Sequence, residues 1–381
     1  MTDTMTDPAP PSAGVVRMER GPDERVNRIT SLPFIAIHFV PLLAIFTGVT
    51  LKAVLLGVGL FYLRMFFITA GYHRYFSHRS YKMGRAAQFV MAFGGGTAAQ
   101  KGALWWAAHH RDHHRNSDTE RDVHSPRNGF WWSHVGWILC DKYAETEYDK
   151  IKDFARYPEL RWLNKWDFVP PWALAGTCFL VAGWSGLVIG FFASTIALWH
   201  STFTINSLAH VMGRRRYATT DTSRNAAVLV PFTMGEGWHN NHHYYQASAR
   251  QGFFWWEIDP SYALLKVLSW MRIVRDLKVP PEAVLHANRI DQGSFDIGMF
   301  RSHWRKASGA VHAAQASIGH KVHDRRVDAA DALAHRRASI EATLHDKKQS
   351  LEGFVHHSLE SAEELARLAR KGERELNVAG E

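Results

Sequence analysis

Histidines at repeated spacings are the residues of this sequence that could do chemistry. Residues 110–114 carry histidines at positions i, i+3 and i+4, which share one side of a helix and form a row of possible ligands. Residues 239–243 repeat that spacing. Neutral imidazole suits iron, copper, zinc and nickel. Two such rows in one chain favour a metal site over isolated buried histidines.

Further candidate ligands lie in two other segments. His73 and His78 are five residues apart, well off one face of an ideal helix, so we expect the helix to end or break between them. Asn206 and His210 are four apart, and the amide could hold a metal-bound water. Nine imidazoles exceed what one ion can bind, so the pattern predicts two metal ions. The candidate ligands are His73, His78, His110, His113, His114, His210, His239, His242 and His243, with Asn206 acting through a water.

Two apolar hairpins must position these histidines. The first has apolar runs at about 32–50 and 53–72, and the second at about 168–183 and 187–203, each near the roughly 20 residues that cross a bilayer as a helix. Lysines and arginines lie before and after each hairpin, whereas the first turn offers only Lys52 and the second has no charge. The positive-inside rule predicts a multi-pass membrane protein with both termini and every histidine cluster in the cytoplasm.

The other segments complete a predicted all-α fold. Residues 86–108 and 130–140 are too interrupted or too short to span, and we expect buried or interfacial helices there. Residues 1–30 are interpreted as a disordered lead, 31–300 as the membrane domain, and 301–381 as a polar tail that forms a solvated helix or a loose coiled coil. The prediction is four transmembrane helices with a cytoplasmic helical cap that holds the metals.

Composition supports a lipid setting. Of the 381 residues, 46% are hydrophobic and 15 are tryptophan, which concentrates at membrane interfaces. Cys140 and Cys178 are the only cysteines, which excludes a disulfide framework and a thiolate metal site. A formal net charge of +9 would suit nucleic acid, anionic lipid headgroups or a phosphate-bearing substrate alike. Composition does not choose among these, but with the apolar spans we expect the bilayer as a partner and no nucleic acid.

The motifs together resemble one enzyme family. His-Arg-Tyr-Phe-Ser-His at 73–78, His-Arg-Asp-His-His at 110–114 and His-Asn-Asn-His-His at 239–243 are similar to the three histidine boxes of the acyl-CoA delta-9 desaturases, the stearoyl-CoA desaturase family. Asn-Ser-Leu-Ala-His at 206–210 resembles that family's additional ligand segment. The likeness covers roughly residues 34–256 and implies a membrane fatty acid desaturase.

The resemblance implies a di-iron centre with a divided ligand set. One iron would be bound by His73, His78, His110, His114 and His242, and the other by His113, His210, His239 and His243 with a water on Asn206. His109 is not a box position and is assigned either to packing or to the residues that orient the ligands. Asp112, Asp122, His124 and His134 fall in well-matched stretches, where they either orient the ligands or make ordinary structural contacts.

The resemblance also implies residues that bend the acyl chain beside the irons, namely Gln100, Trp106 and Thr202. Trp106 and Thr202 each lie four residues, or about one helical turn, before a candidate ligand. Phe61 and Met65 share one helical stripe, and their offset from the first box matches family positions that close the far end of the acyl tunnel. Both could instead face lipid or a neighbouring helix.

By the resemblance, the chain is an oxidoreductase that desaturates a long-chain fatty acyl thioester. Dioxygen would be reduced to water while a cis double bond forms at delta-9. The two electrons would come from a separate ferredoxin, reductase or cytochrome, since the sequence has neither a cysteine set for an iron–sulfur cluster nor a dinucleotide-binding glycine motif. The acyl carrier would be coenzyme A, although the basic cytoplasmic face suits acyl carrier protein or phospholipid as well.

Two other functions fit part of the pattern. A histidine-box hydroxylase of alkanes or carotenoids would share the metals but add oxygen to carbon, and its boxes have different patterns. A product assay separates the two. A non-catalytic metal-binding or transport protein would carry ligands inside the spans, whereas these histidines gather at the cytoplasmic ends. We therefore favour the desaturase.

Overall fold

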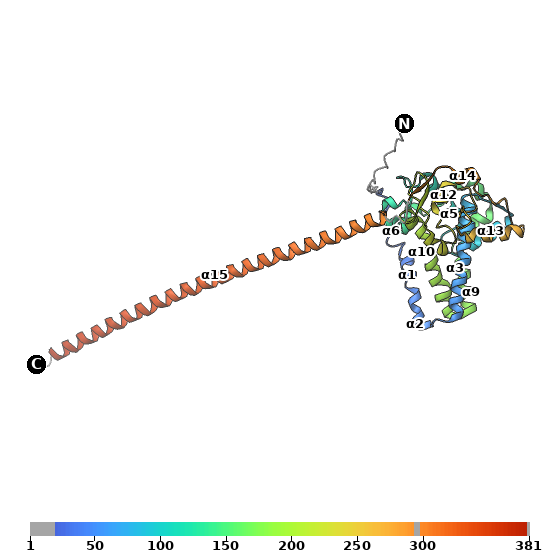
Figure 1. Ribbon diagram of the computed structural model, residues 1–381. Helices are drawn as coiled ribbons and strands as arrows, with labels where there is room; N and C mark the ends of the chain where they lie inside the picture. The colour runs from blue at the N-terminus through green and yellow to red at the C-terminus, as the bar shows by residue number, and fades with distance from the viewer. Residues whose placement is uncertain (1–19, 293–297, 379–381) are drawn as a thin grey trace, which may run out of the picture. The chain divides into compact units, whose positions relative to one another are not determined.

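The computed structural model describes residues 20–292 and 298–378. By its contacts the chain divides into one unit that ends at His303 and another that begins at Trp304. The first unit is mostly helical, and its long helices extend from one side of a cap of shorter elements (Figure 1). The second unit lies within a single helix, α15 (Gly298–Val378). Most of the lead predicted for 1–30 lies outside the described residues.

The first apolar hairpin differs from the prediction at two of its ends. Its elements are α1 (Leu32–Ile37), η1 (Val40–Leu43), α2 (Ala44–Thr47), α3 (Leu51–Phe66) and the π-helix η2 (Phe67–Ser77). Gly48, at φ +71°, ends the first arm, and the Thr50 hydroxyl accepts a hydrogen bond from the Ala53 N–H to begin α3. The first arm therefore stops before residue 50, while the second runs past residue 72 to Ser77.

The second apolar hairpin reverses direction inside one long helical segment. Its elements are α9 (Val169–Ser185), η7 (Gly186–Ala193), α10 (Ser194–Ser207) and η8 (Leu208–His210). Ala182 and Gly183 have non-helical backbone angles, and η7 packs back against α9. Gly183 has φ +60°, which a residue without Cβ adopts freely. The reversal therefore lies at 182–183, slightly earlier than the predicted turn, and Trp184 is already helical.

Two segments are long and apolar enough to cross a membrane, Leu51–Ser77 and Val169–His210. The second segment contains both arms of its hairpin. The apolar stretch Leu32–Thr47 is shorter than these. The sequence predicted four spans, and the described residues contain two segments that meet this length and composition.

The cap is built around α5, the helix that carries the second histidine box. Its elements are α4 (Arg85–Gly96), α5 (Ala103–Asn116), η3 (Pro126–Asn128), α6 (Phe130–His134), η4 (Gly136–Leu139), η5 (Asp141–Tyr143), η6 (Tyr148–Ile151), α7 (Lys152–Ala155), α8 (Pro158–Lys165), η9 (Ala227–Leu229), α11 (Val230–Thr233), α12 (His239–Tyr244), α13 (Pro260–Trp270) and α14 (Glu282–His286). Arg111 binds both Asp153 oxygens, at 2.9 and 3.0 Å, and donates to the carbonyls of Phe76 and Ser77. It thereby ties the end of η2 to α5.

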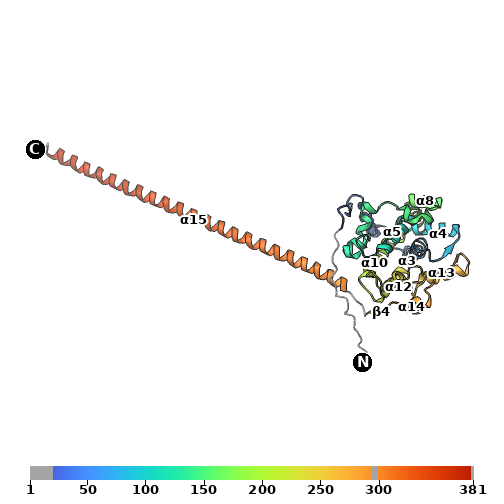
Figure 2. The ribbon, with the colours of Figure 1, turned by 90° about the horizontal axis from the view of Figure 1, so that it is seen from above.

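The glycine-rich stretch at the end of α4 is a packing site. A Cβ at Gly94 would overlap the Phe67 ring, and one at Gly95 would overlap the Tyr72 ring. Glycines therefore let η2 approach α4 closely, and a loop then leads to α5. Seen from above, α3, α5, α10 and α12 lie next to one another in the first unit (Figure 2).

Two short antiparallel sheets make the described fold mostly rather than entirely helical. β1 (Lys82–Met83) pairs with β3 (Val274–Arg275), Lys82 opposite Arg275, and β2 (Arg215–Tyr217) pairs with β4 (Arg289–Gln292), Arg215 opposite Gln292. The all-α prediction missed them because strands this short show no readable alternation of apolar and polar residues.

Candidate metal centre

A π-helix brings the first two histidines together. In η2 the His78 N–H donates to the His73 carbonyl at 3.2 Å, an i→i+5 bond. The wider turn places residues five apart on one face, and the two imidazole centroids lie 4.9 Å apart. The helix ends at Ser77, between the two histidines as expected, and the π-turn is what aligns them.

Five imidazoles from three elements converge on one point. They are His73 and His78 from η2 and its end, His110 and His114 from α5, and His242 from α12. Neighbouring Nε2 atoms in this group are close together. The distances are 3.0 Å for His73–His242 and 2.9 Å for each of His242–His114, His114–His110 and His110–His78. Ligands at right angles on metal bonds of about 2.1 Å would be about 3.0 Å apart. The spacing therefore fits one ion, on the five histidines that the resemblance assigns to one iron.

A second group lies beside the first. His113, His210 and His243 could hold another ion, and His239 Nε2 lies 3.1 Å from His210 Nε2. His243 Nε2 is buried and has no hydrogen-bond partner among the described residues, so a bound cation would use its lone pair. Asn206 lines a cavity of about 40 Å³ together with His113 and His239.

Burial favours the neutral, metal-binding state in five of these imidazoles. Burial lowers the pKa of His78, His110 and His114 well below its usual value, and the charges of neighbouring imidazoles lower it further. Burial lowers the pKa of His239 and His242 in the same way. A neutral ring keeps one nitrogen lone pair for a metal. The all-nitrogen donor set fits iron, as it also fits copper, zinc or nickel.

Buried carboxylates hold the outer nitrogen of four of these histidines. The Nδ1–carboxylate pairs are His113–Asp122 at 2.9 Å, His243–Asp221 at 2.7 Å, His73–Glu236 at 2.6 Å and His210–Asp118 at 3.5 Å. Burial raises the pKa of Asp122, but the charges of His113 and His124 outweigh it and leave this pKa below its usual value. A carboxylate that keeps the proton on Nδ1 leaves Nε2 to bind the metal and fixes the ring orientation.

Of the four polar residues expected near the ligands, Asp122 and His124 lie beside a histidine group, whereas Asp112 and His134 make other contacts. Asp122 contacts a ligand directly, and the His124 ring lies 4.2 Å from that of His113. Asp112 is instead in an ion pair with Lys150 at 3.1 Å. His134 hydrogen-bonds to a serine and a histidine of α10, outside both groups.

His109 belongs to neither histidine group. Its Nδ1 lies 3.0 Å from the Trp105 carbonyl, and its ring packs on the Trp105 indole at 4.4 Å. These contacts are those of a packing residue, one of the two roles expected for it.

Sequence reasoning missed the carboxylates Asp118, Asp221 and Glu236. Glu236 could have been found, because it stands in the Gly-Glu-Gly-Trp run immediately before the third box. Arg74 forms ion pairs with Glu236 at 3.1 Å and with Asp259 at 2.9 Å. A buried ionic network therefore holds Glu236 beside His73. Asp221 lies 11 residues after His210, which is not a spacing typical of metal ligands. The sequence therefore carries no signal for it.

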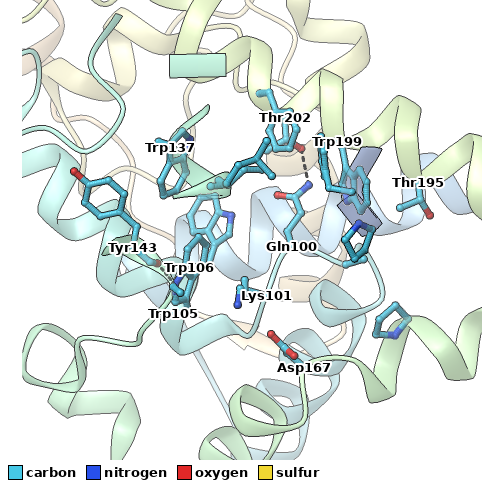
Figure 3. A pocket seen from close by; sticks show the side chains of 18 of the residues that line it. Gln100, Lys101, Trp105, Trp106, Trp137, Tyr143, Asp167, Thr195, Trp199 and Thr202 are labelled. Carbon is cyan, nitrogen blue, oxygen red and sulfur yellow. Dashed lines mark hydrogen bonds between the residues drawn. The ribbon is translucent and has the colours of Figure 1, made fainter. Parts of the chain in front are cut away.

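A cavity of about 600 Å³ runs along one face of α10 to the histidines. Phe191, Thr195, Trp199, Thr202 and Asn206 all line it, at spacings of three or four residues, which is one helical face. Fifteen residues of helix correspond to about 22 Å. Figure 3 shows this wall, with Trp199 and Thr195 leading away from Thr202. The cavity thus has the length and apolar walls that an acyl chain needs.

The three residues expected to bend the acyl chain meet in this cavity. Gln100 Nε2 donates to Thr202 Oγ1 at 3.1 Å (Figure 3). Trp106 also lines the cavity, and its ring stacks on the imidazole of His110 at 4.8 Å. The polar pair and the indole therefore lie where the cavity passes the first histidine group.

Phe61 and Met65 are placed differently from the expectation. Neither lines the 600 Å³ cavity, whose lining along this part of the chain includes Phe191 and Phe192 instead. Met65 is buried beside the histidines in the 40 Å³ cavity, and Phe61 is half-buried with its ring against Tyr62 at 5.0 Å. An offset along α3 could not show that the cavity follows α10.

A buried arginine lies behind the wall of the cavity. Arg64 is 1% exposed and donates to Thr195 Oγ1 and Ser194 Oγ, each at 2.6 Å. Its guanidinium lies 5.8 Å from the Phe191 ring centroid. A charge in an apolar span is costly unless fully hydrogen-bonded, so this network fixes α3 against α10 beside the part of the cavity that Phe191 and Thr195 line.

Comparison with known proteins decides the family. The fatty acid desaturase family model matches residues 49–266, which include all four histidine segments. The chain belongs to the fatty acid desaturase family. Similar curated proteins include a sn-2 palmitoyl-lipid 9-desaturase of Nostoc sp. (strain 36), 34% identical over 58% of this chain and 79% of the relative. A Delta-9 desaturase-like 5 protein of Arabidopsis thaliana is 36% identical over 67% and 86%.

A third relative widens the substrate range of these similar proteins. The icosanoyl-CoA 5-desaturase of Limnanthes douglasii is 35% identical over 57% of this chain and 62% of its own length. The family resemblance drawn from the histidine boxes is therefore confirmed, and the desaturase is an oxidoreductase of lipid metabolism. Family membership decides against the hydroxylase and the non-catalytic metal-binding protein.

Proposed function

We propose that this desaturase inserts a cis double bond at delta-9 of a long-chain acyl-CoA, with dioxygen as co-substrate. The observation that carries the proposal is the apolar cavity, which follows α10 for about 22 Å and reaches His110 beside Gln100 and Thr202. An acyl chain lying in it would present its middle carbons to the first histidine group. Relatives that act on position 9 support the position of the double bond.

Two irons would be bound by the two histidine groups, with a water on Asn206 completing the second. When bound, they would supply the oxidising power toward an unactivated C–H bond that amino-acid side chains lack. The two electrons would come from a separate ferredoxin, reductase or cytochrome.

The chain's own residues position the substrate and exclude water. The α10 face holds the acyl chain straight as far as Thr202, where the hydrogen bond from Gln100 narrows the path and favours a bend. Trp106, stacked on His110, covers the ligand side of that bend. The distal end of the chain would stop at Phe191 and Phe192.

The carrier is proposed to be coenzyme A because a basic cleft adjoins the cavity. This cleft of about 580 Å³ shares Lys101 and Asp167 with the cavity and is also lined by Arg161, Lys165 and Glu145, so that basic residues outnumber acidic ones. Ammonium and guanidinium groups suit a phosphate-bearing carrier. Phospholipid and acyl carrier protein carry phosphate as well, so assays with purified protein and each acyl donor must distinguish the three.

The membrane topology is proposed to be four spans with both termini and the histidines in the cytoplasm. Large apolar side chains at the hairpin ends are exposed, among them Ile45 at 82%, Phe46 at 85% and Leu180 at 84%, which suits contact with lipid. Residue 52 should react with a membrane-impermeant thiol reagent only from outside after Lys52→Cys. Labelling of Arg115→Cys from outside would contradict the topology.

Expression in a desaturase-deficient host tests the function. We expect cis-monounsaturated acyl groups with the double bond at carbon 9, dependent on oxygen and accompanied by no alcohol. Hydroxylated acyl groups, or no product from a folded, iron-loaded protein supplied with electrons, would overturn the proposal.

A further inference from the structure

Ten apolar residues of α15 follow a repeat of 11 positions, whereas Val327, Phe354, Leu359 and Leu365 lie outside this repeat. The first positions of five successive units are Val311, Val322, Leu333, Leu344 and Val355, and the eighth positions are Ile318, Ala329, Ile340, Leu351 and Ala362. On a helix of 3.6 residues per turn, each lies within about 40° of the next, so together they form one seam along the helix. The seam is open, since Leu333 is 68% exposed and Leu351 67%.

Basic residues flank this seam on both sides. The fourth and fifth positions of the three middle units are Arg325 and Arg326, Arg336 and Arg337, and Lys347 and Lys348. They lie about 50° to either side of the seam, whereas the acidic residues of the same stretch lie at least about 90° away. These acids are Asp324, Asp328, Asp331, Glu341, Asp346, Glu352, Glu360, Glu363 and Glu364. The helix is therefore apolar along a line, cationic at both edges of that line and anionic beyond.

This order of charges distinguishes between two kinds of partner. A second copy of α15, parallel or antiparallel, would bring basic edges against basic edges, and like charges beside a helical seam oppose pairing. Arg337 and Lys348 do have acidic partners in their own helix, Glu341 at 3.2 Å and Glu352 at 3.8 Å. These exposed pairs are weak, and they leave the edges cationic as a whole.

A lipid surface accommodates the same order without conflict. Apolar side chains enter the boundary between headgroups and acyl chains, and lysines and arginines at their edges extend back to the phosphates. Basic clusters on such a helix are drawn to anionic lipids. We propose that α15 lies along the surface of an anionic phospholipid bilayer, with its seam inward. The acidic face is then directed to water.

Spin labels on opposite faces of one unit test this in the full chain. Leu344→Cys lies on the seam and Asp346→Cys about 160° from it, and in both variants the buried Cys140 and Cys178 would be replaced by serine. In nanodiscs containing phosphatidylglycerol, we expect the label at 344 to be protected from a water-soluble nickel reagent and accessible to oxygen. The label at 346 should show the reverse. In phosphatidylcholine alone, the two should become alike.

Charge variants separate lipid binding from pairing. Replacing the six basic residues by glutamine should abolish the difference between the two labels in phosphatidylglycerol, while exchanging arginine and lysine at those six sites should preserve it. Equal exposure of both labels to water in anionic nanodiscs would overturn the proposal. So would protection of residue 344 that is independent of lipid charge and accompanied by dipolar coupling between labels of two chains, because it would show that the tails pair.

Discussion

The two histidine groups use the same side chain but are held in different ways. In the second group, three rings point Nδ1 at a carboxylate, whereas in the first only His73 does. The Nδ1 atoms of His114 and His242 are buried without a hydrogen-bond partner among the described residues, as is that of His239 in the second group. The first group is instead aligned by helix geometry, through the π-turn of η2 and the i, i+4 spacing in α5. Local backbone positions one group, and distant carboxylates position the other.

Removal of a ligand should have the largest effect in either group. We expect His78→Ala and His243→Ala each to lower desaturation by more than about 100-fold, since even a residue that only orients a ligand is worth about 10- to 100-fold. His109→Ala, a buried histidine outside both groups, should retain substantial activity and serves as the matched control. Fatty-acid profiles of the expressing cells measure all three. An essential His109 with a dispensable His110 would show that the register of the second box is wrong.

A carboxylate that contacts a histidine of the second group should contribute more to metal affinity than a nearby carboxylate that contacts none. Asp221→Asn removes the charge that faces His243 Nδ1, so we expect metal affinity at the second group to fall by about 10- to 100-fold. Asp112→Asn is the control, because Asp112 pairs with Lys150 instead. Competition with a chelator during metal titration gives both affinities. Equal losses in the two variants would show that the contact between Asp221 and His243 contributes nothing specific to metal binding.

The length of acyl chain that the cavity accepts should depend on residues that line it in the folded structure, rather than on residues chosen by their offset from the first histidine box. We expect Phe192→Ala, in the lining of the cavity, to change the ratio of longer to shorter acyl products by about tenfold, the value of about one methylene. Phe61→Ala, at the position suggested by offset along the helix, should leave that ratio unchanged. Chain-length profiles of the products decide. A shift with Phe61→Ala alone would restore the offset-based assignment.

Truncation of the tail should have the smallest effect, because both histidine groups consist of residues before the tail and none of its described residues joins them. We expect a chain that ends before Val311 to keep near-normal turnover per folded molecule. Turnover and iron content of the purified protein would be compared with the full chain. Lost turnover at unchanged iron content would indicate that the tail takes part in donor docking.

The sequence predicted what local spacing encodes. Histidines at i, i+3 and i+4 in α5 and α12 were recognisable because a helix fixes their relation. The π-turn that joins His73 to His78 was not, since a change of helix type leaves no pattern in 11 residues. Asp118 and Asp221 reach their histidines through tertiary folding from loops, and the cavity follows α10 rather than α3 for the same reason.

The number of irons bound per chain tests most directly whether the two histidine groups form a di-iron centre. Metal analysis by mass spectrometry would compare the purified full-length protein with His78→Ala and His243→Ala, one variant for each group. We expect two irons in the unaltered chain and fewer than two in each variant, since each substitution removes a ligand from one histidine group. One iron, or another metal in place of iron, in an active unaltered chain would contradict it.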